Sequence, residues 1–133
     1  MAAYKTSLSA GALIREILLD SAAVTALTDK IFPVATDIAE LPYILYRRVS
    51  MDQNVQKTGQ PGADTVQIEV ICFTEKYSDG VELAEAVRGA LDNVRDVQTD
   101  DETLVMRGCT LADSEEAWQD DAYLQQLVFN VKI

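Results

Sequence analysis

The chain has 133 residues, of which 48% are hydrophobic and 25% are charged, and this composition is typical of one folded domain over residues 1–133. Eleven Lys and Arg against 22 Asp and Glu give a net charge of -11, which disfavours nucleic-acid binding because an acidic surface repels phosphates. The sequence has no histidine, which excludes Ser–His triads and His-ligated zinc, and we expect no cofactor and no metal site.

The apolar stretches and the cysteines also limit the function. Charged residues interrupt every apolar stretch well before the roughly 20 residues that a membrane helix needs, so we expect neither a membrane segment nor an export signal. Cys72 and Cys109 match no metal-binding or redox spacing. We interpret them as reduced, buried thiols, with a structural disulfide or a reactive thiol as the alternative.

The first part of the chain predicts a helix followed by extended structure. Apolar residues recur at three- and four-residue steps behind Ser9, which is a suitable helix N-cap. They are Ala10, Leu13, Ile14, Ile17 and Leu18. Residues 21–29 predict a short helical turn. Residues 31–34 predict an edge or irregular strand, because Pro33 has no backbone N–H to donate.

The middle of the chain predicts two strands joined by a long loop. Residues 43–50 and 65–74 are rich in β-branched and aromatic residues, and the second segment alternates clearly. We expect Glu69 on the second strand to pair with Arg47 or Arg48 on the first, in preference to an anion site there.

The loop itself, residues 51–64, is polar and longer than most hairpin connections, which favours a projecting, partner-facing segment over a merely solvated one. Its candidate contact residues are Gln53, Asn54, Gln56, Lys57 and Gln60.

The rest of the chain predicts a second helix and two more strands. Asp79 and Glu82 have the spacing of a capping box, and an apolar stripe follows from Leu83 to Val94. Residues 103–111 and 123–133 read as strands. The predicted order is therefore helix, three strands, helix, two strands. This order predicts an α+β fold with two helices packed on one face of a mostly antiparallel sheet.

Acidic residues are concentrated between positions 96 and 121. This segment holds Asp96, Asp100, Asp101, Glu102, Asp113, Glu115, Glu116, Asp120 and Asp121 against Arg107 alone. The spacing lacks the alternating ligands of a calcium loop, and no aromatic sugar platform accompanies a glycosidase-like carboxylate pair.

We favour solvated turns that flank a strand for this segment, with a functional acidic surface as the alternative. That surface would consist of Asp100, Asp101, Glu115, Glu116, Asp120 and Asp121. Trp118 lies among these acids, where its ring either folds back onto the core or meets another protein.

Several apolar core patterns resemble those of the tail completion, or tail terminator, family of long-tailed bacteriophages and prophages. The resemblance begins with Val24-Thr25-Ala26-Leu27, Ile31-Phe32-Pro33 and the run from Leu41 to Ser50. It continues through Val66-Gln67-Ile68-Glu69-Val70 and the helix from Leu83 to Leu91, and the acidic segment from 96 to 121 shows no family pattern.

The resemblance implies a structural protein without catalytic residues, so we expect no enzyme. It also implies a hexameric ring of this chain that caps the tail tube and meets the head connector. The expected partners are other copies of the chain, the tail tube protein and head connector proteins, in the virion tail and, during assembly, in the host bacterial cytoplasm.

Two alternatives to the tail cap remain open from the sequence. One is a head-to-tail connector component, and the other is a small acidic hydrolase or ligand-binding domain. A deep pocket with converging polar groups would favour the latter, whereas a flat subunit with a protruding loop would favour the ring.

Overall fold

A computed structural model of the chain describes residues 6–35, 40–52, 64–99 and 104–133. Its elements, in chain order, are a 3-10 turn η1 (Ser7–Ser9), α1 (Ala10–Asp20), α2 (Ala22–Thr25), β1 (Ile31–Pro33), β2 (Tyr43–Asp52), β3 (Thr65–Thr74), α3 (Tyr77–Leu91), β4 (Val97–Gln98), β5 (Val105–Met106), β6 (Gly108–Gln119) and β7 (Ala122–Lys132).

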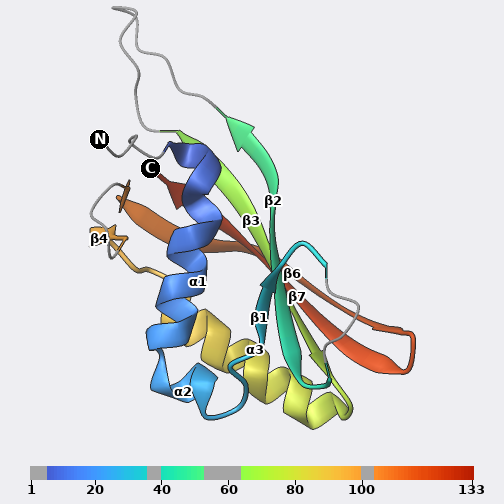
Figure 1. Cartoon of the computed structure of the whole chain (residues 1–133). Coiled ribbons are helices and arrows are strands. Elements are labelled where there is room, and N and C mark those ends of the chain that lie inside the picture. The colour runs from blue at the N-terminus through green and yellow to red at the C-terminus, as the bar shows by residue number, and fades with distance from the viewer. Residues whose placement is uncertain (1–5, 36–39, 53–63, 100–103) are drawn as a thin grey trace, which may run out of the picture.

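The main sheet has five strands in the order β1-β2-β3-β7-β6, and β4 and β5 form a separate two-stranded ladder. All neighbours in the main sheet are antiparallel except β1 and β2. Helices α1 and α3 both lie on one face of this sheet, as Figure 1 shows. The predicted α+β fold is thereby confirmed.

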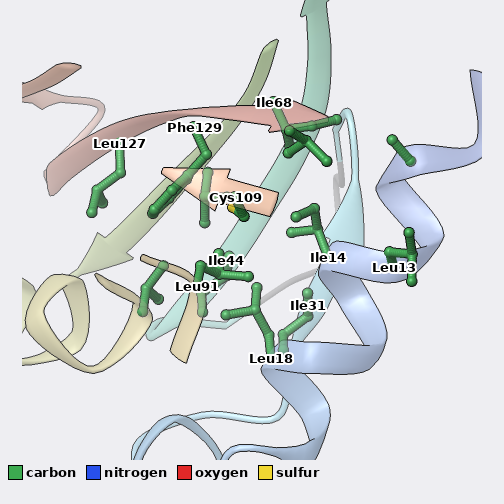
Figure 2. Close-up of a cluster of buried hydrophobic side chains, with 14 of the residues drawn as sticks. Leu13, Ile14, Leu18, Ile31, Ile44, Ile68, Leu91, Cys109, Leu127 and Phe129 are labelled. Atoms are coloured by element: carbon green, nitrogen blue, oxygen red, sulfur yellow. The ribbon is translucent and has the colours of Figure 1, made fainter. Parts of the chain in front are cut away.

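The central strand β3 shows why the helices cover only one face. Its residues alternate strictly between buried and half-buried, and Val66, Ile68, Val70 and Cys72 are fully buried. The apolar stripes of α1 and α3 close over this face, and Leu13, Ile14, Leu18 and Leu91 belong to the same buried cluster as Ile68 and Phe129 (Figure 2). Burial of such side chains is the main driving force that holds helices on a sheet.

Helix α1 begins directly after Ser9 as predicted but lacks the expected capping hydrogen bond, and α3 begins earlier than predicted. Ser9 directly precedes α1, but its side chain makes no capping hydrogen bond, and the Thr6 hydroxyl instead accepts one from the Leu8 amide at the start of η1. Helix α3 begins at Tyr77 rather than at Asp79, without a side-chain cap. Tight packing at this end compensates, because Gly80 lies against Thr74, whose hydroxyl donates to the Lys76 carbonyl.

The predicted strand over residues 103–111 begins outside the described residues, and within them it is broken at Arg107 and ends too early. The chain forms the short β5 there and then β6, which continues to Gln119 and includes acids that were expected in turns. Periodicity failed because the second half of β6 is exposed on both faces, so its side chains show no apolar alternation. Asp120 and Asp121, at φ 52° and 62°, make the two-residue turn into β7, a conformation that aspartate tolerates better than most residues.

Candidate interaction surfaces

The predicted contact residues fall into two groups by their placement. Gln53, Asn54, Gln56, Lys57 and Gln60, and likewise Asp100 and Asp101, lie outside the described residues, so their roles stay predictions. The other four predicted acids, Glu115, Glu116, Asp120 and Asp121, all lie in one exposed stretch of the hairpin formed by β6 and β7.

We call residues 112–121 the outer hairpin. It begins where the register between β6 and β7 shifts after Leu111, and every one of its residues is exposed. Figure 1 shows this hairpin extending away from the two helices. Its five acids are Asp113, Glu115, Glu116, Asp120 and Asp121, and it contains no Lys or Arg.

The acids of the outer hairpin do not form one surface. Glu115 pairs in register with Gln126 and Glu116 with Gln125. Because neighbouring residues of a strand point to opposite faces, Glu115 lies on the uncovered face of the sheet and Glu116 on the helix side. The predicted acidic surface is therefore divided between two faces and a turn.

An aromatic cluster surrounds Glu116 on the helix side. The Trp118 and Tyr123 rings meet edge to face with centroids 4.6 Å apart, and the Tyr77 ring meets Tyr123 at 5.7 Å. Trp118 is 55% exposed and Tyr77 is 48% exposed, so the expectation that Trp118 could fold back onto the core is wrong. These rings and Gln125 line a shallow groove of about 230 Å³, which we call the aromatic groove.

Hydrogen bonds fix the Glu116 carboxylate within the aromatic groove. The Gln125 side-chain amide donates to Oε2 at 3.0 Å and the Tyr77 hydroxyl donates to the same atom at 2.9 Å. These two donors lower the pKa of Glu116, and the same hydrogen bond raises the pKa of Tyr77. The groove therefore presents a charged, oriented carboxylate between exposed aromatic rings.

A second groove, of about 560 Å³, lies on the uncovered face of the sheet. Tyr43 and Phe73 stack on one another there at 4.6 Å. Burial and, to a smaller extent, the Asp120 carboxylate raise the pKa of Tyr43, which keeps its hydroxyl neutral. The groove therefore presents an apolar wall and a neutral phenol.

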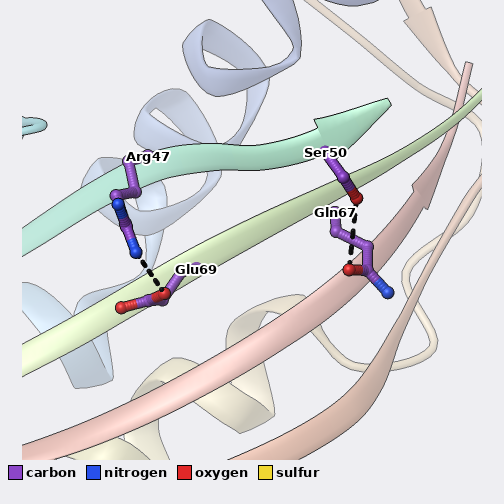
Figure 3. A network of polar contacts seen from close by, with 4 residues as sticks. All are labelled: Arg47, Ser50, Gln67 and Glu69. Atoms are coloured by element: carbon purple, nitrogen blue, oxygen red, sulfur yellow. Dashed lines mark hydrogen bonds and ion pairs between the residues drawn. The ribbon is translucent and has the colours of Figure 1, made fainter. Parts of the chain in front are cut away.

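Polar pairs continue across the uncovered face beside this groove. Arg47 donates to Glu69 at 3.2 Å, which confirms the predicted pairing, and Ser50 donates to Gln67 at 3.2 Å (Figure 3). Arg47 and Glu69 on this face thus neutralise one another. Arg48 instead donates to the Leu8 carbonyl at 2.9 Å and ties the N-terminal turn to the sheet, a role that the sequence did not reveal.

A basic pocket lies at the opposite end of the β6–β7 hairpin from the turn. Arg95, Arg107 and Lys132 line this pocket of about 290 Å³ together with Asn93 and Asn130, and none of its lining residues is acidic. Lys132 stands opposite Gly108 where β6 begins, and its carbonyl accepts from the Arg107 amide at 2.7 Å. Sequence reasoning missed this pocket, because its cations are spread over 38 positions and are adjacent only in the fold.

Neither cysteine is exposed or joined in a disulfide. Cys72 and Cys109 are buried and free, as predicted. Burial raises the pKa of each thiol to about 12, with a smaller contribution from the Asp92 carboxylate at Cys109.

Within the described residues, no three His, Cys, Asp or Glu side chains lie close enough together to hold a metal ion. No helix in the described ranges is long and apolar enough to cross a membrane.

Comparisons with known proteins agree with the resemblance in the core patterns. One solved structure, a chain from the virion of a native gene transfer agent particle, matches with a TM-score of 0.74 and 18% sequence identity. The match covers 96% of this chain and 98% of the other, and at this identity it shows a shared fold. A comparison with curated proteins gave no match. The model of the family described as tail completion protein gp17 matches residues 12–133, and the chain therefore belongs to this family of structural phage tail proteins.

Proposed function

We propose that this chain forms a hexameric ring in the virion, which caps the tail tube and joins it to the head connector. The observation that carries the proposal is the match of the tail completion family model to residues 12–133. The chain of similar fold from a gene transfer agent virion supports a place in a phage-like particle. The net charge of -11 suits a subunit past which DNA must slide without binding.

The distribution of surface features supports a ring more than a two-fold dimer. Cyclic assemblies with heterologous interfaces use two different patches on each subunit, and closure follows when the rotation between neighbours completes a circle. The exposed aromatic groove and the basic pocket are two such patches, with different shape and opposite charge.

The test is to remove the gene from its phage or prophage and to examine the particles. We expect tails that do not join heads, and restoration when the protein is supplied. Cryo-electron microscopy and quantitative mass spectrometry of complete particles should place about six copies at the head-proximal end of the tail. Two or twelve copies would contradict the ring, and a location on tail-free heads would favour the connector alternative.

The hydrolase or ligand-binding alternative has a separate test. The large groove contains two carboxylates among its lining residues, Glu69 and Asp120, and Glu69 is paired with Arg47. We expect no turnover in a broad screen of ester, phosphate and glycoside substrates. Turnover that disappears in the Glu69→Gln or Asp120→Asn variant would overturn the structural role as the sole function.

A further inference from the structure

The β6–β7 hairpin carries opposite charge at its two ends. The outer hairpin holds five acids and no cation, whereas the basic pocket holds Arg95, Arg107 and Lys132 and no acid. None of these three cations forms an ion pair with another described residue. Residue pairs run from Gly108 to Gln119 with one register shift between Leu111 and Asp113, so the two ends lie roughly 35 Å apart at the usual rise of a strand. They cannot neutralise one another within one subunit.

The acidic end also contains a position at which a cation can bind. Glu116 is held by Tyr77 and Gln125 with its carboxylate beside the exposed Trp118 ring. A guanidinium can stack on an indole face and bond a carboxylate at once, and such contacts strengthen when water is excluded. Exposed tryptophan and tyrosine are the side chains that most often anchor protein interfaces. The aromatic groove therefore fits a basic protein surface that contains arginine.

We propose that the basic partner is a second copy of this chain. The aromatic groove and outer hairpin of one subunit dock onto the basic pocket of the next, and the carboxylates of the first face Arg95, Arg107 and Lys132 of the second. The assignment of this occupant rests on charge complementarity, since the matching basic pocket is present in the same molecule, at the other end of the β6–β7 hairpin. The inference rests on the proposed ring, for which it supplies the interface between neighbouring subunits.

The first test reverses the charge of each end separately. Variant A carries Asp113→Lys, Glu115→Lys and Glu116→Lys, which changes the charge of the outer hairpin from -5 to +1. Variant B carries Arg95→Glu, Arg107→Glu and Lys132→Glu, which changes the charge of the basic pocket from +3 to -3. Alone, each variant meets like charges in its neighbour, so we expect at least a tenfold loss of rings on tails. Mixed in equal amounts, A and B present opposite charges at every contact of an alternating ring. We expect the mixture to restore complete particles, and an alternating ring closes only with an even number of subunits.

A matched control separates this interface from a general effect of charge. The triple variant Asp79→Lys, Glu82→Lys and Glu85→Lys changes the net charge as much as variant A, but on the exposed side of α3. It should assemble like the wild type. Circular dichroism of every variant checks that the subunit is folded. Rings from A or B alone, or folded A and B that give no ring when mixed, would overturn the inference.

A second test identifies the occupant directly. A photoreactive benzoylphenylalanine in place of Trp118 should cross-link, on assembled tails, to the residues that line the basic pocket of another copy, in 93–95, 107–110 or 130–132. A cross-link to a different virion protein, or to no protein at all, would contradict the second copy as the occupant. The proposed function and the docking inference can fail separately. The proposed function fails when wild-type protein does not complete tails. The docking inference fails when wild-type rings form but the charge reversal or the cross-link gives the contradicting result named above.

Discussion

The inner and outer parts of the β6–β7 hairpin belong to the same two strands, but only the inner part is covered by the helices. On the inner part, Cys109, Phe129 and Val131 are fully or almost fully buried beneath the helices. On the outer part, every residue from 112 to 121 is exposed, including Trp118. The pairing of the two strands continues across the boundary, with one register shift between Leu111 and Asp113.

This difference shows how far along the hairpin packing against the core constrains the side chains. Side chains of the inner part are fixed by packing against α1 and α3, whereas no side chain from 112 to 121 belongs to the buried core cluster. A long ladder without a core beneath it exposes an edge strand, which proteins protect with charge, and the outer hairpin is rich in carboxylates. Its residues are thus free to be selected for contacts with other molecules.

The largest effect should come from Phe129→Ala in the inner part. Phe129 is fully buried and large, and its truncation leaves a cavity that the surrounding helices and strands fill only in part. We expect the free energy of unfolding to fall by about 3 to 5 kcal/mol. Urea denaturation followed by circular dichroism measures this change. A loss below about 1 kcal/mol would show that the covered part is not the stabilising part.

A second, smaller effect should come from Gly80→Ala, where α3 meets the sheet. The added Cβ would lie 2.8 Å from Thr74 Oγ1, and this hydroxyl is already bonded to the Lys76 carbonyl. We expect a loss of about 1 to 3 kcal/mol from overpacking. Gly89→Ala, on the exposed side of the same helix, is the matched control, because its Cβ meets nothing within 4 Å. Helix propensity should make it more stable by about 0.5 to 1 kcal/mol.

The same boundary between covered and uncovered strands explains which elements the sequence predicted. Residues 10–20, 65–74 and 83–91 carry a periodic apolar pattern because one side of each is buried, and their type is confirmed, although α3 ends at Leu91 and the predicted stripe continued to Val94. The outer half of β6 has no such side, so no period marked it as a strand. Strand β4 has two residues, too few for any pattern.

The candidate contacts follow a similar rule. The Arg47–Glu69 pair was predictable, since two neighbouring antiparallel strands bring these residues together. The basic pocket was not, because Arg95 precedes β4, Arg107 lies between β5 and β6, and Lys132 ends β7. The cluster around Glu116 was also missed, because it needs Tyr77 from the start of α3. The exposed aromatic residues of α3 and β6 are isolated in the sequence, so no pattern indicated that they lie close together in the fold.

Trp118→Ala tests the outer part and should have a small effect on the isolated subunit. The ring is 55% exposed and packs on Tyr123 at one edge, so its removal gives up one aromatic pair and little buried area. We expect a loss of about 0.5 to 1.5 kcal/mol, well below that of Phe129→Ala. Urea denaturation compares the two, and Trp118→Phe should keep most of the aromatic contact. A loss as large as that of Phe129→Ala would show that the outer hairpin belongs to the folding unit.

The smallest effect concerns the junction between the two parts, where Asp92 holds Leu111. The Asp92 carboxylate accepts from the Leu111 amide at 2.9 Å and from Arg88 Nε at 3.4 Å. The backbone hydrogen bond from Leu111 is the main cause that lowers the pKa of Asp92, and Arg88 contributes less. A lowered pKa in the folded state means that the charged form stabilises the fold. This contribution is present above the ordinary pKa of aspartate, near 3.9, and is lost as the pH falls through the lower, folded pKa.

Asp92→Asn keeps an oxygen that can accept from Leu111 but removes the titration. We therefore expect the melting temperature of the wild type to fall more steeply than that of the variant below about pH 4, so that the difference between them shrinks with acid. At neutral pH the wild type should be slightly the more stable. Thermal melts from pH 2 to 7 measure both curves, with Glu82→Gln, which changes an exposed acid beyond the first turn of α3, as the control. A difference that does not change with pH would mean that the Asp92 charge does not hold the strand where the outer hairpin begins.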